Sequence, residues 1–137
     1  MDIFKIAEEG SVISDEEIAK LLEQALMDWE SRRGAVRNAL VIPPDFTRFH
    51  SNAGFITNAY WHLLAERGAQ VDVLPALGTH VPVSETQWKA MFGDIPYSAM
   101  IVHDWRNDVV KLGEIPQAAV EEISEGLWHH PVPVEVN

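Results

Sequence analysis

The chain has 137 residues, of which 47% are apolar, and its 10 basic and 21 acidic side chains give a net charge of −11. This length and apolar content predict a single domain, spanning residues 1–137, with one hydrophobic core. The negative charge argues against nucleic acid and anionic membranes as partners, because binding to either without sequence preference needs clustered Lys and Arg.

Cysteine is absent from the sequence, which excludes disulfides, thiolate zinc sites and a cysteine nucleophile. The N-terminal segment Met1–Lys5 lacks the basic start and apolar core of a signal peptide, and no apolar run approaches the roughly 20 residues of a membrane-spanning helix. We therefore expect a soluble, cytoplasmic protein.

The first predicted element is a helix from Ser14 to Arg33. Its apolar residues recur at helical spacing and form one stripe: Ile18, Leu21, Leu22, Ala25, Leu26 and Trp29. Ser14 and Glu17 form a capping box at its start. Trp29 in this stripe, and Trp88 further along the chain, are predicted to lie in the core.

A strand over residues 39–42 precedes the second predicted helix, which runs from about Asn52 to Arg67. Ser51 is its expected N-cap, and Gly68 follows its last residue, as glycine commonly does at helix ends.

Another strand is expected over residues 71–76, followed by a short helix after Pro82. Ser84 and Gln87 form a second capping box there, and Gly93 is expected to end the helix.

The C-terminal part is less regular. Residues 99–102 and 109–112 have strand character, and this tail forms either a β-hairpin or an edge addition. Residues 117–123 and 132–136 are ambiguous, and Pro133 allows the last segment only as an edge strand.

The alternation of strands and helices predicts an α/β fold, with a three-layer, Rossmann-like, mostly parallel sheet and helices on both faces. The carboxyl ends of parallel strands meet at one edge of a sheet. The loops after Ile42, Leu77 and Val102 are therefore expected to lie near one another.

These three loops carry candidate ligand-binding side chains. They are Asp45, Thr47 and Arg48 in the first loop, Gly78, Thr79 and His80 in the second, and His103 and Asp104 in the third. The Arg48 guanidinium suits a carboxylate or a phosphate, and a helix beginning at Ser51 adds free backbone donors. The structural alternatives are a local pair between Arg48 and Asp45, and an Asx turn with a cap formed by Asp45 and Thr47.

His80 is the predicted catalytic residue, because Gly78 permits close backbone approach to a ligand and an imidazole exchanges protons near neutral pH. His103 and Asp104 resemble a base with its orienting carboxylate, although adjacent residues rarely face each other. The dinucleotide, P-loop, zinc-protease and serine-hydrolase motifs do not occur. No metal site is predicted, and the other histidines are expected on loops, on a helix face or at the surface: His50, His62, His129 and His130.

Two of these loops resemble the N-terminal domain of the nickel-dependent lactate racemase family. The motifs are Asp45-Phe46-Thr47-Arg48 and Ala76-Leu77-Gly78-Thr79-His80. The similarity extends from about Val36 to Pro116. Phe49 and Val81 stand where the family has proline and arginine.

The resemblance implies an isomerase that interconverts the stereoisomers of a 2-hydroxy acid with a nickel pincer nucleotide as cofactor. It assigns His80 to proton transfer at the substrate hydroxyl, and Arg48, with Asp45 and Thr47, to holding the substrate or the cofactor. The family's second catalytic histidine, cofactor-bearing lysine and nickel-ligating histidine lie beyond the matched region. We therefore expect the chain to be either part of a longer protein or a truncated, stand-alone relative. We expect no covalently held cofactor and no racemase activity from the chain alone, and a missing C-terminal lobe or a partner chain would complete the site.

Two other functions are open from the residues alone. One is a non-catalytic binding module for a small molecule that carries a phosphate or a carboxylate. The other is a partner-binding domain, for which Trp105 and Trp128 would be the anchors and a stable dimer the signature.

Overall fold

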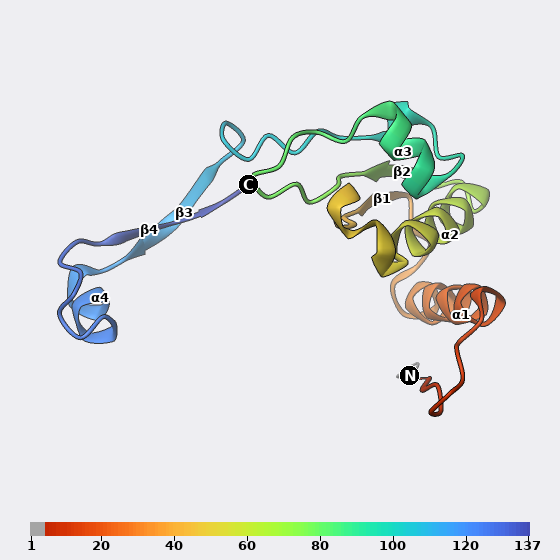
Figure 1. Cartoon of the computed structure of the whole chain (residues 1–137), viewed down its shortest axis with the longest axis horizontal. Helices are drawn as coiled ribbons and strands as arrows, with labels where there is room; N and C mark the ends of the chain where they lie inside the picture. The colour runs from red at the N-terminus through yellow and green to blue at the C-terminus, as the bar shows by residue number, and fades with distance from the viewer. Residues whose placement is uncertain (1–4) are drawn as a thin grey trace. The chain divides into compact units, whose positions relative to one another are not determined.

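A computed structural model describes residues 5–137, so Met1–Phe4, the start of the segment without signal-peptide features, lie outside it. The chain divides into two compact units, Met1–Val102 and His103–Asn137. We call the first the α/β unit and the second the ribbon unit (Figure 1). The predicted single domain over residues 1–137 stays a prediction.

Helix α1 (Asp15–Arg33) begins at the predicted capping box, in which the Ser14 hydroxyl accepts a hydrogen bond from the Glu17 backbone and the Glu17 carboxylate accepts one from Ser14. Its buried residue Leu26 packs with Leu64 of the next helix. The expectation for Trp29 is wrong, because this residue is 46% exposed. The predicted stripe is wider than the face that α1 buries.

Strands β1 (Asn38–Val41) and β2 (Gln70–Val73) pair in parallel over their full length. The parallel pairing continues beyond the strands at Pro44 and Ala76. Together with the helices, this small parallel sheet makes the unit α/β.

The strand predicted over residues 99–102 does not form. A 3-10 helix, η2 (Tyr97–Ala99), occupies its start, and only Met100 makes a parallel bridge, to Val73. The bridge is accompanied by a hydrogen bond from the Ile101 amide to the Val73 carbonyl, 2.8 Å long. The third strand is thus reduced to one point of contact.

The segment after β1 forms a 3-10 helix, η1 (Phe46–Ser51), followed by α2 (Ala53–Glu66). The predicted N-cap of α2 is wrong: Asn52 takes that position in the left-handed conformation, with φ of 62°. Because η1 continues through Ser51, the chain must change direction at the residue between the two helices. At the other end Gly68, with φ of 82°, follows α2 as expected.

Helix α3 (Glu85–Phe92) matches its prediction, with a capping box formed by Ser84 and Gln87 and with Gly93 at its end. Trp88 and Phe92 are fully buried, and the Trp88 indole donates a hydrogen bond of 2.7 Å to the Ile95 carbonyl.

Helix α2 packs against one face of the β1–β2 sheet, and α1 and α3 pack against α2. Val71 and Val73 of β2 lie on this inner face and belong to the two hydrophobic clusters that include α1, α2 and α3. Helix α2 lies between the strands and α1 (Figure 1). Alternate residues point the other way. Leu40 of β1, whose partner in β2 is Asp72, is 50% exposed, and Ile42, just after β1, is 61% exposed.

The ribbon unit contains β3 (Val110–Ile115), α4 (Gln117–Ile123) and β4 (Val132–Val136), and its two strands pair antiparallel. A hairpin with a helix in its connection is therefore the form that the C-terminal segment takes. Pro133 is accommodated because each strand of a two-stranded ribbon is an edge.

Within residues 5–137, no helix combines the length and the apolar character that crossing a membrane requires.

Gly54 marks a close approach between α2 and α3. A Cβ at this position would lie 2.1 Å from the Met91 backbone carbonyl oxygen. We expect Gly54→Ala to lower the free energy of unfolding by about 1–3 kcal/mol, as overpacking does, although alanine normally favours a helix over glycine. Urea unfolding monitored by circular dichroism measures the change.

Gly113→Ala is the matched control, because no atom lies within 4 Å of the Cβ position there. We expect it to change the free energy of unfolding by less than about 0.5 kcal/mol. Equal effects of the two substitutions would show that the contact between α2 and α3 is not tight.

Candidate functional site

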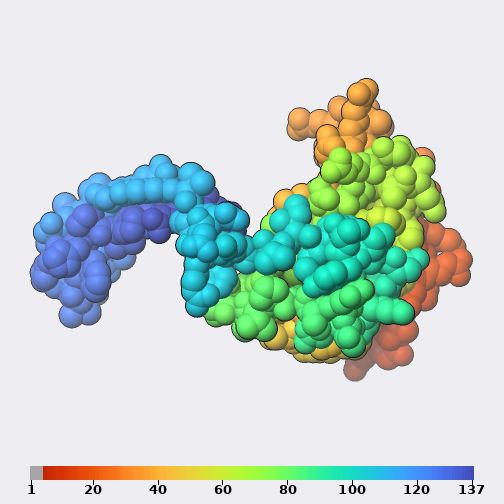
Figure 2. All heavy atoms as spheres, turned by 90° about the horizontal axis from the view of Figure 1, so that it is seen from above, coloured from red at the N-terminus to blue at the C-terminus, as the bar shows by residue number. Residues whose placement is uncertain are grey.

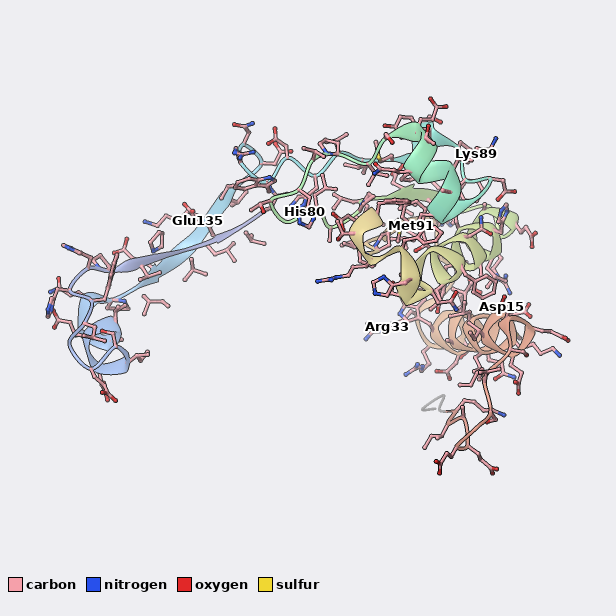
Figure 3. All side chains as sticks on the ribbon, viewed as in Figure 1. Asp15, Arg33, His80, Lys89, Met91 and Glu135 are labelled. Atoms are coloured by element: carbon pink, nitrogen blue, oxygen red, sulfur yellow. The ribbon has the colours of Figure 1, made fainter. Side chains whose placement is uncertain are left out.

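The candidate site is formed by the loops that follow the two paired strands. Asp45 comes directly after Pro44, and His80 lies at the end of the turn that begins at Leu77. Because Pro44 and Ala76 still pair in parallel, the two loops leave the sheet side by side. Figure 3 shows the His80 ring beside η1, at this end of the unit.

Asp45 uses both carboxylate oxygens. Its Oδ2 lies 2.6 Å from His80 Nδ1, and its Oδ1 accepts hydrogen bonds from the Thr47 amide, 3.2 Å, and the Thr47 hydroxyl, 2.5 Å. Asp45 is thus the N-cap of η1 as well as the partner of His80. The Asx turn considered as an alternative for Asp45 and Thr47 does form, through Oδ1. It leaves Oδ2 for the hydrogen bond with His80.

The surroundings of Asp45 keep its carboxylate ionised. Burial, which leaves 8% of the side chain exposed, raises its pKa, but hydrogen bonds from Thr47 and His80 outweigh that effect and hold the pKa below the ordinary value of 3.8. A negative charge therefore faces His80 at neutral pH.

This charge selects one tautomer of the His80 ring. An ionised carboxylate only accepts hydrogen bonds, so Nδ1 carries a proton and Nε2 of the neutral ring keeps its lone pair. The His80 side chain is 55% exposed, which gives a ligand access to the ring. The pair has the chemistry of a general base with its orienting carboxylate.

The remaining predicted residues of these two loops lie close to the pair in the sequence. Thr47 and Arg48 lie in η1 and are exposed, and the Asp45 oxygens are bonded to Thr47 and His80 rather than to the Arg48 guanidinium. Gly78 and Thr79, also exposed, lie in the turn before His80.

Ser51 ends η1, where its hydroxyl accepts a hydrogen bond of 3.4 Å from the Ala53 amide. The Ser51 side chain is thereby used at the junction between η1 and α2.

His103 and Asp104 belong to the ribbon unit, not to the unit that holds Asp45 and His80. Both Asp104 oxygens accept hydrogen bonds from the Asn107 side chain, at 3.0 and 2.8 Å. This bonding lowers the pKa of Asp104 and closes a local turn. The Asp104 carboxylate therefore serves the turn.

A second histidine and carboxylate pair joins α2 to the loop after α3. His62 Nε2 lies 2.9 Å from Asp94 Oδ1, which also accepts a hydrogen bond from Asn58. Asn58 in turn donates to the Phe92 carbonyl, so the pair fixes the end of α3. A surface depression of about 440 Å³ runs along α3, away from Asp45 and His80.

In the described part of the chain, no three His, Cys, Asp or Glu side chains come together in a group able to hold a metal ion.

Sequence reasoning placed Asp45 and His80 at the same sheet edge but did not pair them with each other. The signal was present in the motif positions, because each residue follows a strand of the same parallel pair. The register of the two strands, with Pro44 opposite Ala76, determines which residues of the two loops lie side by side where they leave the sheet. The sequence does not give this register.

No protein-family model and no curated protein matches the chain. A crystal structure of a protein from Thermotoga maritima is similar, with a TM-score of 0.74 and 24% sequence identity. The match covers 90% of this chain and 30% of the Thermotoga chain. This likeness supports the fold, and the present chain spans less than a third of that protein.

Asp45→Asn should remove the tautomer preference of His80, because an amide can donate to Nδ1 as well as accept from it. Long-range ¹H–¹⁵N spectra of the neutral ring distinguish the two tautomers. We expect wild type to be protonated at Nδ1 and the variant to contain both forms. A wild-type ring protonated at Nε2 would contradict the assigned pair.

Asp45 should also contribute to acid unfolding. Its pKa is lowered in the folded protein, so its stabilisation is full above the unfolded pKa, near 3.8, and disappears as the pH falls through the folded value. We expect the free energy of unfolding, measured with urea, to be higher for wild type than for Asp45→Asn at pH 6. This difference should be smaller at pH 3. A difference that does not change with pH would show that the carboxylate charge contributes nothing.

Proposed function

We propose that this chain forms one half of the active site of a lactate racemase-like isomerase acting on a 2-hydroxy acid. The observation that carries the proposal is the hydrogen bond between Asp45 and His80, which lie in the loops that follow the paired strands β1 and β2. His80 is also the residue to which the resemblance of the two motifs assigns proton transfer. An oriented, accessible imidazole is what that role requires.

In this proposal, His80 Nε2 removes the proton from the substrate hydroxyl, and the Asp45 carboxylate stabilises the imidazolium that results. The exposed Arg48 holds the substrate carboxylate through two parallel hydrogen bonds. Removing this proton would prepare C2 to give up a hydride to a bound acceptor. Return of the hydride to either face, with the proton returned from His80 to the oxygen, would give either stereoisomer.

The cofactor implied by the resemblance, a nickel pincer nucleotide, supplies the hydride acceptor when it is bound. The turn before His80 suits close approach of such a ligand, because Gly78 has φ of 57° and no atom lies within 4 Å of its Cβ position. Thr79 and Arg48 are available for its anionic groups. The nickel ligand and the lysine that the family uses lie beyond the matched region, so in this proposal they belong to a further lobe or a partner chain.

We further propose that another lobe completes both the site and the fold. This chain spans 30% of the similar Thermotoga chain. Leu40 and Ile42 are exposed on the outer side of the parallel sheet, which they share with the polar Asp72, whereas parallel sheets are usually covered on both faces. Helices on this face would give the three-layer, Rossmann-like arrangement, and the absence of cysteine suits a cytoplasmic protein.

Ligand binding by the isolated chain tests the proposal. We expect lactate, and separately nicotinic acid mononucleotide, to shift backbone amide resonances of residues 45–51 and 78–80 in ¹H–¹⁵N spectra. Arg48→Ala should weaken lactate binding about tenfold or more, because a hydrogen bond to a charged group contributes about 1.5–3 kcal/mol.

Arg33→Ala is the matched control, because it removes the same charge at the end of α1 and should leave lactate binding unchanged. Equal losses in the two variants, or no shifts at millimolar ligand, would contradict the proposed site. His80→Gln should keep lactate binding, since the ring serves proton transfer. Racemisation of lactate by the isolated chain with nickel would show that no second lobe is needed.

A further inference from the structure

The ribbon unit lacks a hydrophobic interior of its own. Every residue from His103 to Asn137 is exposed or half-buried. In Figure 2 the blue atoms of β3, α4 and β4 form a thin layer rather than a rounded body. A two-stranded ribbon becomes stable when further strands or a helix cover an apolar face.

The register of β3 and β4 places apolar residues on one face of the ribbon. Cross-strand partners point to the same side of a sheet, and sides alternate along a strand. The residues on this face are Val110, Gly113 and Ile115 of β3, and Val132, Val134 and Val136 of β4. The five side chains are 36–62% exposed. We call this surface the ribbon apolar face.

The opposite face of the ribbon carries polar side chains that pair with one another. Lys111 pairs with Glu135 across the strands and forms a 3.0 Å ion pair with Glu114. Pro133 faces Glu114 and completes this side. The two faces therefore differ as the buried and solvent-facing sides of a covered sheet do.

The charge of the unit indicates what covers the ribbon apolar face. Residues 103–137 contain seven acidic and two basic side chains, a net charge of −5. A second copy would bring the same negative charge against this one, whereas a surface with Lys and Arg around an apolar centre would complement it.

We propose that the ribbon apolar face docks an amphipathic α-helix of a partner protein, with Leu-type side chains on its apolar stripe and Lys or Arg beside them. The helix follows from the geometry, because one helix can cover a two-stranded ribbon and supply its missing core. The basic flanks follow from the negative charge. This docking is independent of the Asp45 and His80 site.

The test uses the full chain and, as probe, an 18-residue amphipathic helix made of Leu and Lys. We expect the probe to shift amide resonances of β3 and β4 in ¹H–¹⁵N spectra. Val134→Asp adds one negative charge at the centre of the ribbon apolar face. It should weaken binding at least about tenfold, because docking would bury that charge, although general attraction to a cationic peptide would increase.

Lys111→Gln is the matched control, because it makes the same change in net charge on the polar face. It should leave binding within about twofold or strengthen it. Val110→Thr, which keeps shape and charge at the most exposed position of the face, should weaken binding severalfold even if Val134→Asp disturbs the ribbon.

Three outcomes would overturn the proposal. The first is undiminished binding to Val134→Asp and Val110→Thr, which would reveal charge attraction alone. The second is the absence of shifts in β3 and β4. The third is a light-scattering mass of two chains that Val134→Asp reduces to one, which would identify a second copy as the occupant.

Discussion

The parallel pairing of β1 and β2 is the constraint on which the candidate site depends. The pairing does not stop where the strands end, because Pro44 and Ala76 remain opposite each other. Asp45 and the Leu77–His80 turn thus begin from neighbouring positions. A carboxylate and an imidazole separated by 35 positions in the sequence come within 2.6 Å for this reason.

Asp45 links the local structure of this region to its chemistry. One oxygen caps η1 by accepting hydrogen bonds from Thr47, and the other accepts one from His80. The same buried carboxylate therefore positions both the helix that carries Arg48 and the His80 ring. Burying a charge is unfavourable unless hydrogen bonds compensate it. The bonds that keep Asp45 ionised are therefore also those that hold the site together.

Both units leave apolar side chains of a sheet exposed. In the α/β unit, α2 covers the inner face of the sheet, with Trp61 donating a hydrogen bond to the Val71 carbonyl, while Leu40 lies on the open side. In the ribbon unit, the face centred on Val134 is open. Apolar sheet faces are normally buried. This common feature underlies our proposals that further polypeptide meets each unit.

The sequence by itself determined the elements whose signals are local. The capping boxes at Ser14 and Ser84 and the glycine after α2 fixed helix ends, because such signals involve residues three or four positions apart. It also placed Asp45 and His80 at one sheet edge. Tertiary structure decided the pairing of these two side chains, the exposure of Trp29, and the reduction of the third strand to a bridge at Met100. Each depends on how distant segments align and which faces they cover, which local periodicity does not encode.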